Sequence, residues 1–270
     1  MKKAQASVFN HQYKKEKKDD FTPFEIYLKH SNAMEISSKR LRKILLELKG
    51  DSLKILDVGS NDGSFLIKSL PKGKKVEITF LEPSKNPFEK LVKNTKQNKE
   101  WKCINQTFED FYQNSKEKYD VVLASHLYHF PRKKYQELLS QLASLLKDSG
   151  TLIWIERGID DITDLKRRFL RILLPSLYPQ DWVPRNYKRA LEILKEKEGN
   201  TELVLNNSVL RFPSVSKSND AIVIVEFFFS IEWGSMPKSI QEEILEYLDE
   251  RNGVLQQEEG IIIYKKNNGE

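Results

Sequence analysis

The stretch LDVGSNDGSFL, from Leu56 to Leu66, constrains the fold most strongly, because a buried-type strand runs directly into a turn bracketed by two glycines. A short aliphatic run that ends at glycine is typical of a strand in a parallel sheet, and the apolar positions after it suit a helix packed on that sheet. Glycine also lets a ligand approach the main chain closely. The stretch therefore predicts a strand, a tight turn and a helix, with a ligand near the turn.

Acidic residues around this turn indicate which kind of ligand it suits. Asp57 and Asp62 would repel a pyrophosphate, and the G-x-G-x-x-G pattern of dinucleotide sites is missing. A cationic amino-acid group would be attracted instead. Glu82 ends the next predicted strand about twenty residues after the turn, where an acid accepts hydrogen bonds from ribose hydroxyls in nucleoside-binding sheets. The two features together predict a nucleoside that carries a cationic group.

Strands alternate with helices over the first 156 residues. This alternation predicts an α/β fold with a parallel sheet, helices on both faces and right-handed crossovers. The expected helices lie within 24–48, 63–70, 86–94 and 133–150, the last closed by Gly150, and the expected strands lie within 53–59, 76–83, 117–127 and 151–156.

The rest of the chain has a different pattern. Residues 160–199 are helical and interrupted by prolines, and a helix over 237–250 precedes a final strand over 260–266. Two stretches between them, 201–212 and 221–231, are rich in β-branched and aromatic residues. We expect both to be strands, and VEFFFSIEW in particular to be a buried one.

Composition limits the classes of function. The 270 residues are 39% hydrophobic, which suffices for one large domain or one domain with an insertion. Cys103 is the single cysteine, so an internal disulfide and a cysteine metal cluster are excluded, and we expect no metal. No apolar run reaches the roughly 20 residues of a membrane span, and no signal peptide is evident, which predicts a cytoplasmic protein without membrane contact. The net charge is +6, but acidic residues are interleaved with most of the lysines. This pattern favours charged helix faces in contact with solvent over a surface that binds nucleic acid.

Five motifs in order resemble those of the class I S-adenosylmethionine-dependent methyltransferases. They span 55–63 (ILDVGSNDG), 81–84 (LEPS), 105–111 (NQTFEDF), 119–130 (YDVVLASHLYHF) and 145–156 (LLKDSGTLIWIE). The resemblance covers roughly residues 43–156. It implies a Rossmann-like seven-stranded methyltransferase sheet, S-adenosylmethionine as cofactor and S-adenosylhomocysteine as product.

The same resemblance implies roles for individual residues. Gly59, Ser60 and Gly63 would line the methionine part of the cofactor, and Glu82 would bind its ribose. Thr107 and Phe108 would flank the adenine, and Ala124 and Ser125 would lie near the sulfonium. The complete predicted cofactor site is Asp57, Gly59, Ser60, Asn61, Gly63, Glu82, Pro83, Thr107, Phe108, Ala124 and Ser125.

Two histidines follow the strand that would face the transferred methyl group. His126, Tyr128 and His129 are therefore candidate catalytic residues, with one histidine as general base, because histidine titrates near neutral pH. The alternative, which the sequence favours, is that they wall the pocket or cap the next helix. Alignment of acceptor and methyl group can carry most of the acceleration without a base.

A narrower resemblance is to histamine N-methyltransferase and its small-molecule relatives, through FEIYLKHS, LYHF and a β-rich insertion before the last strand. It implies a small acceptor methylated at nitrogen or oxygen. The expected domains are a disordered basic arm (1–20), an N-terminal helical lid (21–50), a cofactor-binding core (51–156) and a substrate cap that completes the sheet (157–270). An aromatic acceptor pocket, which would also suit a cationic amine, is expected from Phe24, Tyr27, Tyr128, Trp182, Phe228 and Trp233.

Two further functions stay open. One is a methyltransferase for RNA or protein that uses the basic surface, and the other is a domain that binds the cofactor without catalysis. Adenine-N6 methylation of nucleic acid is disfavoured and no DNA partner is expected, because SHLY at 125–128 replaces the Asn/Asp-Pro-Pro-aromatic clamp that this reaction uses in its family. The acceptor itself is not identifiable from the sequence.

Overall fold

The computed structural model describes residues 22–127, 130–178, 182, 185–213 and 219–267. The chain divides into two compact units. The larger unit comprises Glu35–Gly158, Arg185–Asn206 and Glu259–Glu270, and the smaller one comprises Met1–Met34, Ile159–Pro184 and Asn207–Glu258. The expected arm lies outside the described residues, and the expected lid and cap stay predictions.

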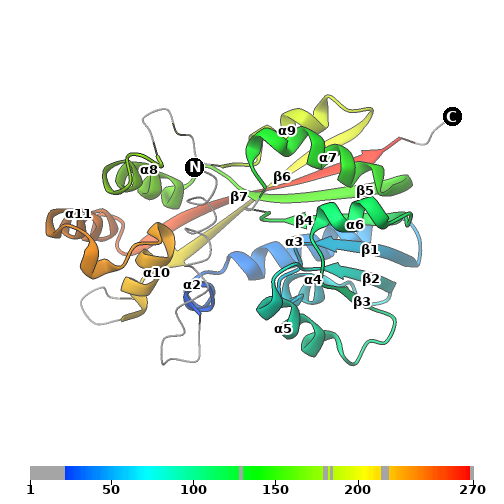
Figure 1. Ribbon diagram of the computed structural model, residues 1–270, viewed down its shortest axis with the longest axis horizontal. Coiled ribbons are helices and arrows are strands. Elements are labelled where there is room, and N and C mark those ends of the chain that lie inside the picture. The colour runs from blue at the N-terminus through cyan, green and yellow to red at the C-terminus, as the bar shows by residue number, and fades with distance from the viewer. Residues whose placement is uncertain (1–21, 128–129, 179–181, 183–184, 214–218, 268–270) are drawn as a thin grey trace. The chain divides into compact units, whose positions relative to one another are not determined.

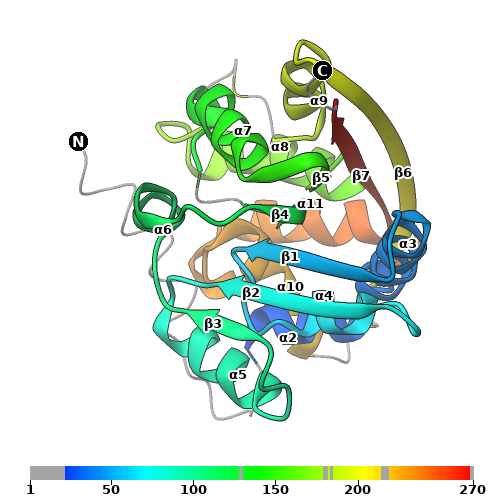
Figure 2. The same cartoon turned by 90° about the vertical axis from the view of Figure 1, so that its right-hand side faces the viewer.

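Within the described residues, seven strands form one sheet in the order β3-β2-β1-β4-β5-β7-β6 (Figure 1), and Figure 2 shows the same strands from β3 at one edge. β1 to β5 are parallel, and β7 runs antiparallel to β5. This arrangement confirms the predicted Rossmann-like α/β fold. The strands are β1 (Ser52–Val58), β2 (Lys75–Leu81), β3 (Lys102–Ile104), β4 (Tyr119–Ser125), β5 (Leu146–Arg157), β6 (Gly199–Arg211) and β7 (Val254–Lys266).

Helices cover both faces of the sheet because alternate strand residues point to opposite sides. Leu56 and Val122 lie in a core cluster with α6, α7 and α9, whereas Ile55 and Val121 lie in a second cluster with α3, α4 and α5. These helices are α3 (Ala33–Glu47), α4 (Ser64–Ser69), α5 (Lys85–Thr95), α6 (Phe108–Asn114), α7 (Tyr135–Ser144) and α9 (Lys188–Lys195), with a 3-10 turn, η1 (Arg132–Lys134), before α7.

The smaller unit has its own hydrophobic core. Phe169 and Phe229 are fully buried there and meet edge to face, with ring centroids 6.2 Å apart. Its elements are α2 (Pro23–His30), α8 (Asp161–Leu173), α10 (Asn219–Phe229), η2 (Trp233–Ser235) and α11 (Lys238–Asp249). No helix in the described part of the chain is both long and apolar enough to span a membrane.

The predicted strand over residues 221–231 is wrong, because most of this stretch forms helix α10. Six of its apolar residues are buried, and α10 packs against α2 and α8. A helix that is apolar nearly all round can be buried in this way, so tertiary packing overrides the β propensity of valine, isoleucine and phenylalanine.

The helix predicted over 133–150 is also too long. It ends at Ser144, and strand β5 begins at Leu146, which pairs with Tyr119 at the start of β4. Gly150 therefore lies within the strand and does not cap the helix. The sheet pairing of Leu146, which the helical spacing could not show, decides where the helix stops.

Gly260 in β7 provides a stability prediction for the larger unit. A Cβ atom at this position would lie 2.5 Å from Cδ1 and 2.9 Å from Cδ2 of the buried Tyr187 ring. Because the ring cannot retract, Gly260→Ala should lower the free energy of unfolding by about 1–3 kcal/mol, measured by urea unfolding. Gly234→Ala is the control, since its Cβ would meet no atom within 4 Å; an equal loss in both variants would contradict the packing explanation.

Candidate active site

The glycine turn follows the carboxyl end of β1 and is hydrogen-bonded to the carboxyl end of β2. Gly59 and Gly63 have φ angles of +71° and +75°, which glycine adopts without strain. The backbone N–H groups of Gly59 and Ser60 both donate to the Leu81 carbonyl, at 2.8 and 3.1 Å. The Ser60 hydroxyl donates to the Asp57 carbonyl at 2.7 Å and accepts from the Leu81 N–H at 3.1 Å. Ser60 thus fixes the turn against the next strand.

Glu82 lies directly beside this turn. Its Oε2 accepts the Asn61 N–H at 2.9 Å, and its Oε1 accepts the Ser84 N–H at 2.8 Å. Asn61 has a φ of +52°, a conformation that asparagine tolerates better than most residues. A carboxylate has about four acceptor positions, so two remain for a diol. The Asn105 amide completes the corner by donating to the carbonyls of Glu82 and Pro83, at 2.8 and 3.1 Å.

Asp57 is buried below the same turn. Burial raises its pKa to about 7 from an ordinary value of 3.8, against the lowering effect of a hydrogen bond from Ser60, and the charge of Glu82 adds to the rise. An incoming cationic group would therefore relieve the cost of ionising this carboxyl.

Thr107 and Phe108 begin helix α6. The Thr107 hydroxyl accepts the Asp110 N–H at 3.1 Å and donates to the Asp110 carboxylate at 2.8 Å, so it caps the helix. Phe108 is only 3% exposed, and its ring packs 6.3 Å from the Phe130 ring. The predicted role of both residues beside adenine stays a prediction.

Ala124 and Ser125 end β4, and Ala124 pairs with Val58 of β1. Leu127 follows them and lies against the turn, since a Cβ on Gly59 would be 2.5 Å from its Cδ2. The ends of β1, β2 and β4 therefore meet at one edge of the sheet, which places the predicted cofactor residues of these strands together.

His126 continues from β4 into a network that sequence reasoning missed. Its Nε2 lies 2.9 Å from Oε2 of Glu259 in β7. Glu259 Oε1 accepts the Ser37 hydroxyl at 2.5 Å and the Asn206 amide at 3.1 Å. Burial alone would raise the pKa of Glu259, but the hydrogen bonds from His126, Ser37 and Asn206 and the charge of His126 bring it below its ordinary value. Glu259 is therefore a stabilised carboxylate.

A second buried acid, Glu156, lies at the end of β5. It accepts the Tyr135 hydroxyl at 2.6 Å and the Trp154 indole N–H at 3.1 Å. Burial raises its pKa, while those two hydrogen bonds and the charges of His126 and Arg185 act in the opposite direction. An acid stands at the carboxyl end of the strand in TLIWIE, as Glu82 does after β2, so the strand-end signal that indicated Glu82 could also have indicated Glu156.

Five of the six predicted acceptor residues lie in the smaller unit. Tyr27 and Phe228 are buried, with ring centroids 5.8 Å apart, and Phe24 stacks on Tyr27 at 6.1 Å. Trp182 and Trp233 pack against the same core. Tyr128 and His129 lie outside the described residues. An acceptor-binding role for this aromatic cluster stays a prediction.

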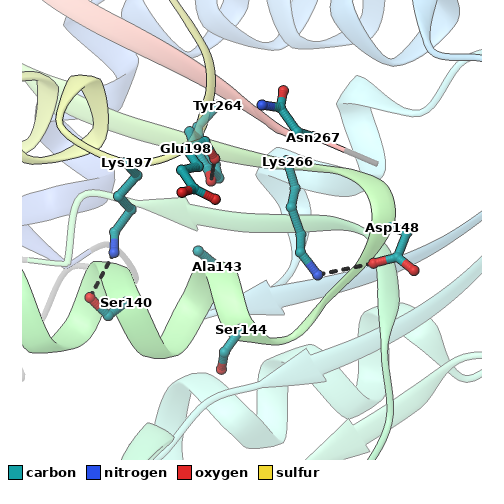
Figure 3. Close-up of a pocket in the computed structure, with 9 residues that line it drawn as sticks. All are labelled: Ser140, Ala143, Ser144, Asp148, Lys197, Glu198, Tyr264, Lys266 and Asn267. Atoms are coloured by element: carbon teal, nitrogen blue, oxygen red, sulfur yellow. Dashed lines mark hydrogen bonds and ion pairs between the residues drawn. The ribbon is translucent and has the colours of Figure 1, made fainter. Parts of the chain in front are cut away.

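A surface groove of about 500 Å³ lies elsewhere on the larger unit (Figure 3). Asp148, near the start of β5, lines it and pairs with Lys266 at 3.1 Å, and Lys197 donates to Ser140 at 2.8 Å. From Thr151, where the regular pairing of β5 with β4 resumes, Glu156 is five residues further along the strand, or about 17 Å at 3.3 Å per residue. The groove is therefore separate from the candidate site.

Comparisons with known proteins agree with the fold. Residues 56–152 match the family model of a methyltransferase domain. The fold is similar to three solved structures at 14–15% sequence identity. YcgJ from Bacillus subtilis and a candidate methyltransferase from Bacillus halodurans C-125 each align with a TM-score of 0.55, over 86% of this chain and 99% of that chain. A candidate sarcosine dimethylglycine methyltransferase from Galdieria sulphuraria aligns with a TM-score of 0.51, over 85% of this chain and 85% of that chain. A search of the curated proteins gave no match.

The domain match identifies residues 56–152 as similar to a methyltransferase domain, and the strand order and the solved structures show the Rossmann-like fold. A methyltransferase domain of this kind indicates S-adenosylmethionine as the methyl donor. The residues present fit that donor: Glu82 offers acceptor positions for the ribose diol, and Asp57 offers a buried carboxyl for the ammonium group. The narrower likeness to histamine N-methyltransferase stays a prediction.

Proposed function

We propose that the protein transfers the methyl group of S-adenosylmethionine to a small-molecule acceptor, at nitrogen or oxygen. The observation that carries the proposal is the position of three polar side chains. His126 and Glu156 lie at the carboxyl ends of β4 and β5, and Glu259 lies beside them in β7. Ligands of open α/β sheets bind beyond these strand ends. Polar groups of this kind can orient a small acceptor.

The residues of the larger unit divide into two roles in this proposal. Glu82 and Asp57 hold the cofactor, which, when bound, supplies an electrophilic methyl group. His126 and the groups around it orient the acceptor atom toward that methyl group, and alignment of this kind accounts for much of the acceleration in such displacements.

The macromolecular alternatives have less support. The buried Glu156 and the mostly covered Glu259 lie at the strand ends where the acceptor would approach, and their carboxylates would repel the phosphates of an RNA backbone. The remaining alternative is a domain that binds the cofactor without catalysis. Such a domain would bind the cofactor equally well but would form no methylated product.

A transfer assay tests the proposal. The full chain is incubated with tritiated S-adenosylmethionine and, separately, with small amines, phenols, total RNA or bulk protein. We expect label in an amine or a phenol. Label only in RNA or protein would contradict the small-molecule proposal, and S-adenosylhomocysteine binding without label in any acceptor would favour the non-catalytic alternative.

A further inference from the structure

His126 sits in a backbone conformation that needs support. Its φ of +52° is uncommon for a residue other than glycine. Its N–H donates to the Ile155 carbonyl at 2.8 Å, so the residue is still tied to β5 just beyond the end of β4. Backbone strain of this kind persists only where surrounding structure fixes it.

The His126 ring is fixed by a carboxylate that accepts two further hydrogen bonds. Glu259 comes from β7, 133 residues further along the chain, and accepts hydrogen bonds from Ser37 of α3 and Asn206 of β6. Arg40 donates to the Asn206 amide oxygen at 3.3 Å, which orients the amide nitrogen toward Glu259. Three separate segments of the larger unit, α3, β6 and β7, thus hold the carboxylate that contacts the imidazole.

The exposures of the two side chains differ in a useful way. The His126 side chain is 33% exposed, whereas that of Glu259 is 12% exposed. An acceptor can therefore reach the ring, while the carboxylate stays behind it. Because an ionised carboxylate only accepts hydrogen bonds, the neutral ring must carry its proton on Nε2, which makes Nδ1 the basic nitrogen.

We propose that Glu259 is a positioning residue that holds His126 as the proton acceptor for the methyl acceptor, which is therefore an amine or a hydroxyl compound. This inference rests on the proposed function and deepens it. As the acceptor nitrogen or oxygen bonds to the methyl carbon, the carbon–sulfur bond breaks and its electron pair stays on sulfur. The acceptor N–H or O–H proton passes to Nδ1 of His126, and the imidazolium, still paired with Glu259, releases it to solvent.

The test compares the full-length wild type with Glu259→Gln and with the control Glu258→Gln, which removes the same charge one residue away. The first readout is the imidazole 15N spectrum, in which His126 is assigned by the signal lost in His126→Asn. We expect the Nε2–H form in the wild type and in Glu258→Gln. In Glu259→Gln an amide NH2 can face the ring, so the Nδ1–H form should become populated.

The second readout is methyl transfer to tyramine, histamine and catechol. Glu259→Gln should lower kcat about ten- to a hundredfold, with KM for S-adenosylmethionine within about twofold, because the cofactor residues are untouched. His126→Asn should lose at least as much, and Glu258→Gln should match the wild type.

Three results would overturn the inference without refuting the proposed function. They are an unchanged kcat in Glu259→Gln, a raised KM for S-adenosylmethionine as the main effect, and no transfer to any of the three acceptors by a protein that binds S-adenosylhomocysteine. Failure to bind S-adenosylhomocysteine would instead refute the proposed function itself.

Discussion

Replacement of Asp57 by asparagine is expected to stabilise the free protein by about 4 kcal/mol at pH 8, although it alters the predicted cofactor site. The reason is the pKa of about 7 that burial imposes on this carboxyl, against an ordinary value of 3.8. At pH 8 the wild type must hold an ionised carboxylate in the core, and asparagine has the same shape without the charge. Urea unfolding at several pH values measures the difference.

The sign of the pH dependence follows from the same shift. Between about pH 4 and pH 7 the folded chain keeps the Asp57 proton and the unfolded chain has lost it, so wild-type stability should fall as pH rises through this window. The gain in Asp57→Asn should therefore shrink toward pH 4. Asp62→Asn, which makes the same charge change in the same turn, is the control. Equal pH slopes in wild type and Asp57→Asn would contradict the burial of an ionisable Asp57.

Replacement of Glu82 by glutamine should weaken S-adenosylhomocysteine binding about a hundredfold. The carboxylate accepts two backbone N–H groups and can accept two ribose hydroxyls as well, whereas an amide offers one acceptor oxygen. Two weakened hydrogen bonds to a charged group amount to about 3 kcal/mol, which gives this factor. Isothermal titration measures it.

Glu77→Gln is the matched control for this change, because Glu77 lies on the same strand, β2, at its exposed end. It should bind S-adenosylhomocysteine as tightly as the wild type. Glu82→Gln should also unfold more easily by about 1–3 kcal/mol, since one turn N–H loses its acceptor. A Glu82→Gln protein that is folded and keeps wild-type affinity would remove Glu82 from the cofactor site.

Local sequence signals predicted strand β1, the turn after it and the strand-end position of Glu82. Strand β1, the glycine turn and Glu82 lie within 30 residues of one another, so hydrophobic period, glycine positions and a strand-end acid suffice to describe them. The structure adds what Ser60 and Asn61 do: one hydroxyl and one N–H fix the turn to β2 and Glu82. Those bonds depend on the parallel register of two strands.

Two features of the structure could not be predicted from local sequence signals, because they depend on contacts between distant parts of the chain. Glu259 faces His126 only because β7 runs antiparallel to β5. The sequence QQEEG does not indicate which of its two glutamates, Glu258 or Glu259, faces the histidine. Helix α10 contains many residues with a high β propensity, and it is helical because it is buried against α2 and α8. In both cases the deciding contacts join residues far apart in the chain.

The most direct test of the cofactor site is an amide chemical-shift titration of the full-length protein with S-adenosylhomocysteine. We expect the largest shifts at the turn and the strand end beside it, centred on Gly59, Asn61 and Glu82, and the same shifts to be lost in Glu82→Gln. Shifts centred on the groove of Figure 3, or no shifts at all, would contradict the assignment of this edge of the sheet as the S-adenosylmethionine site.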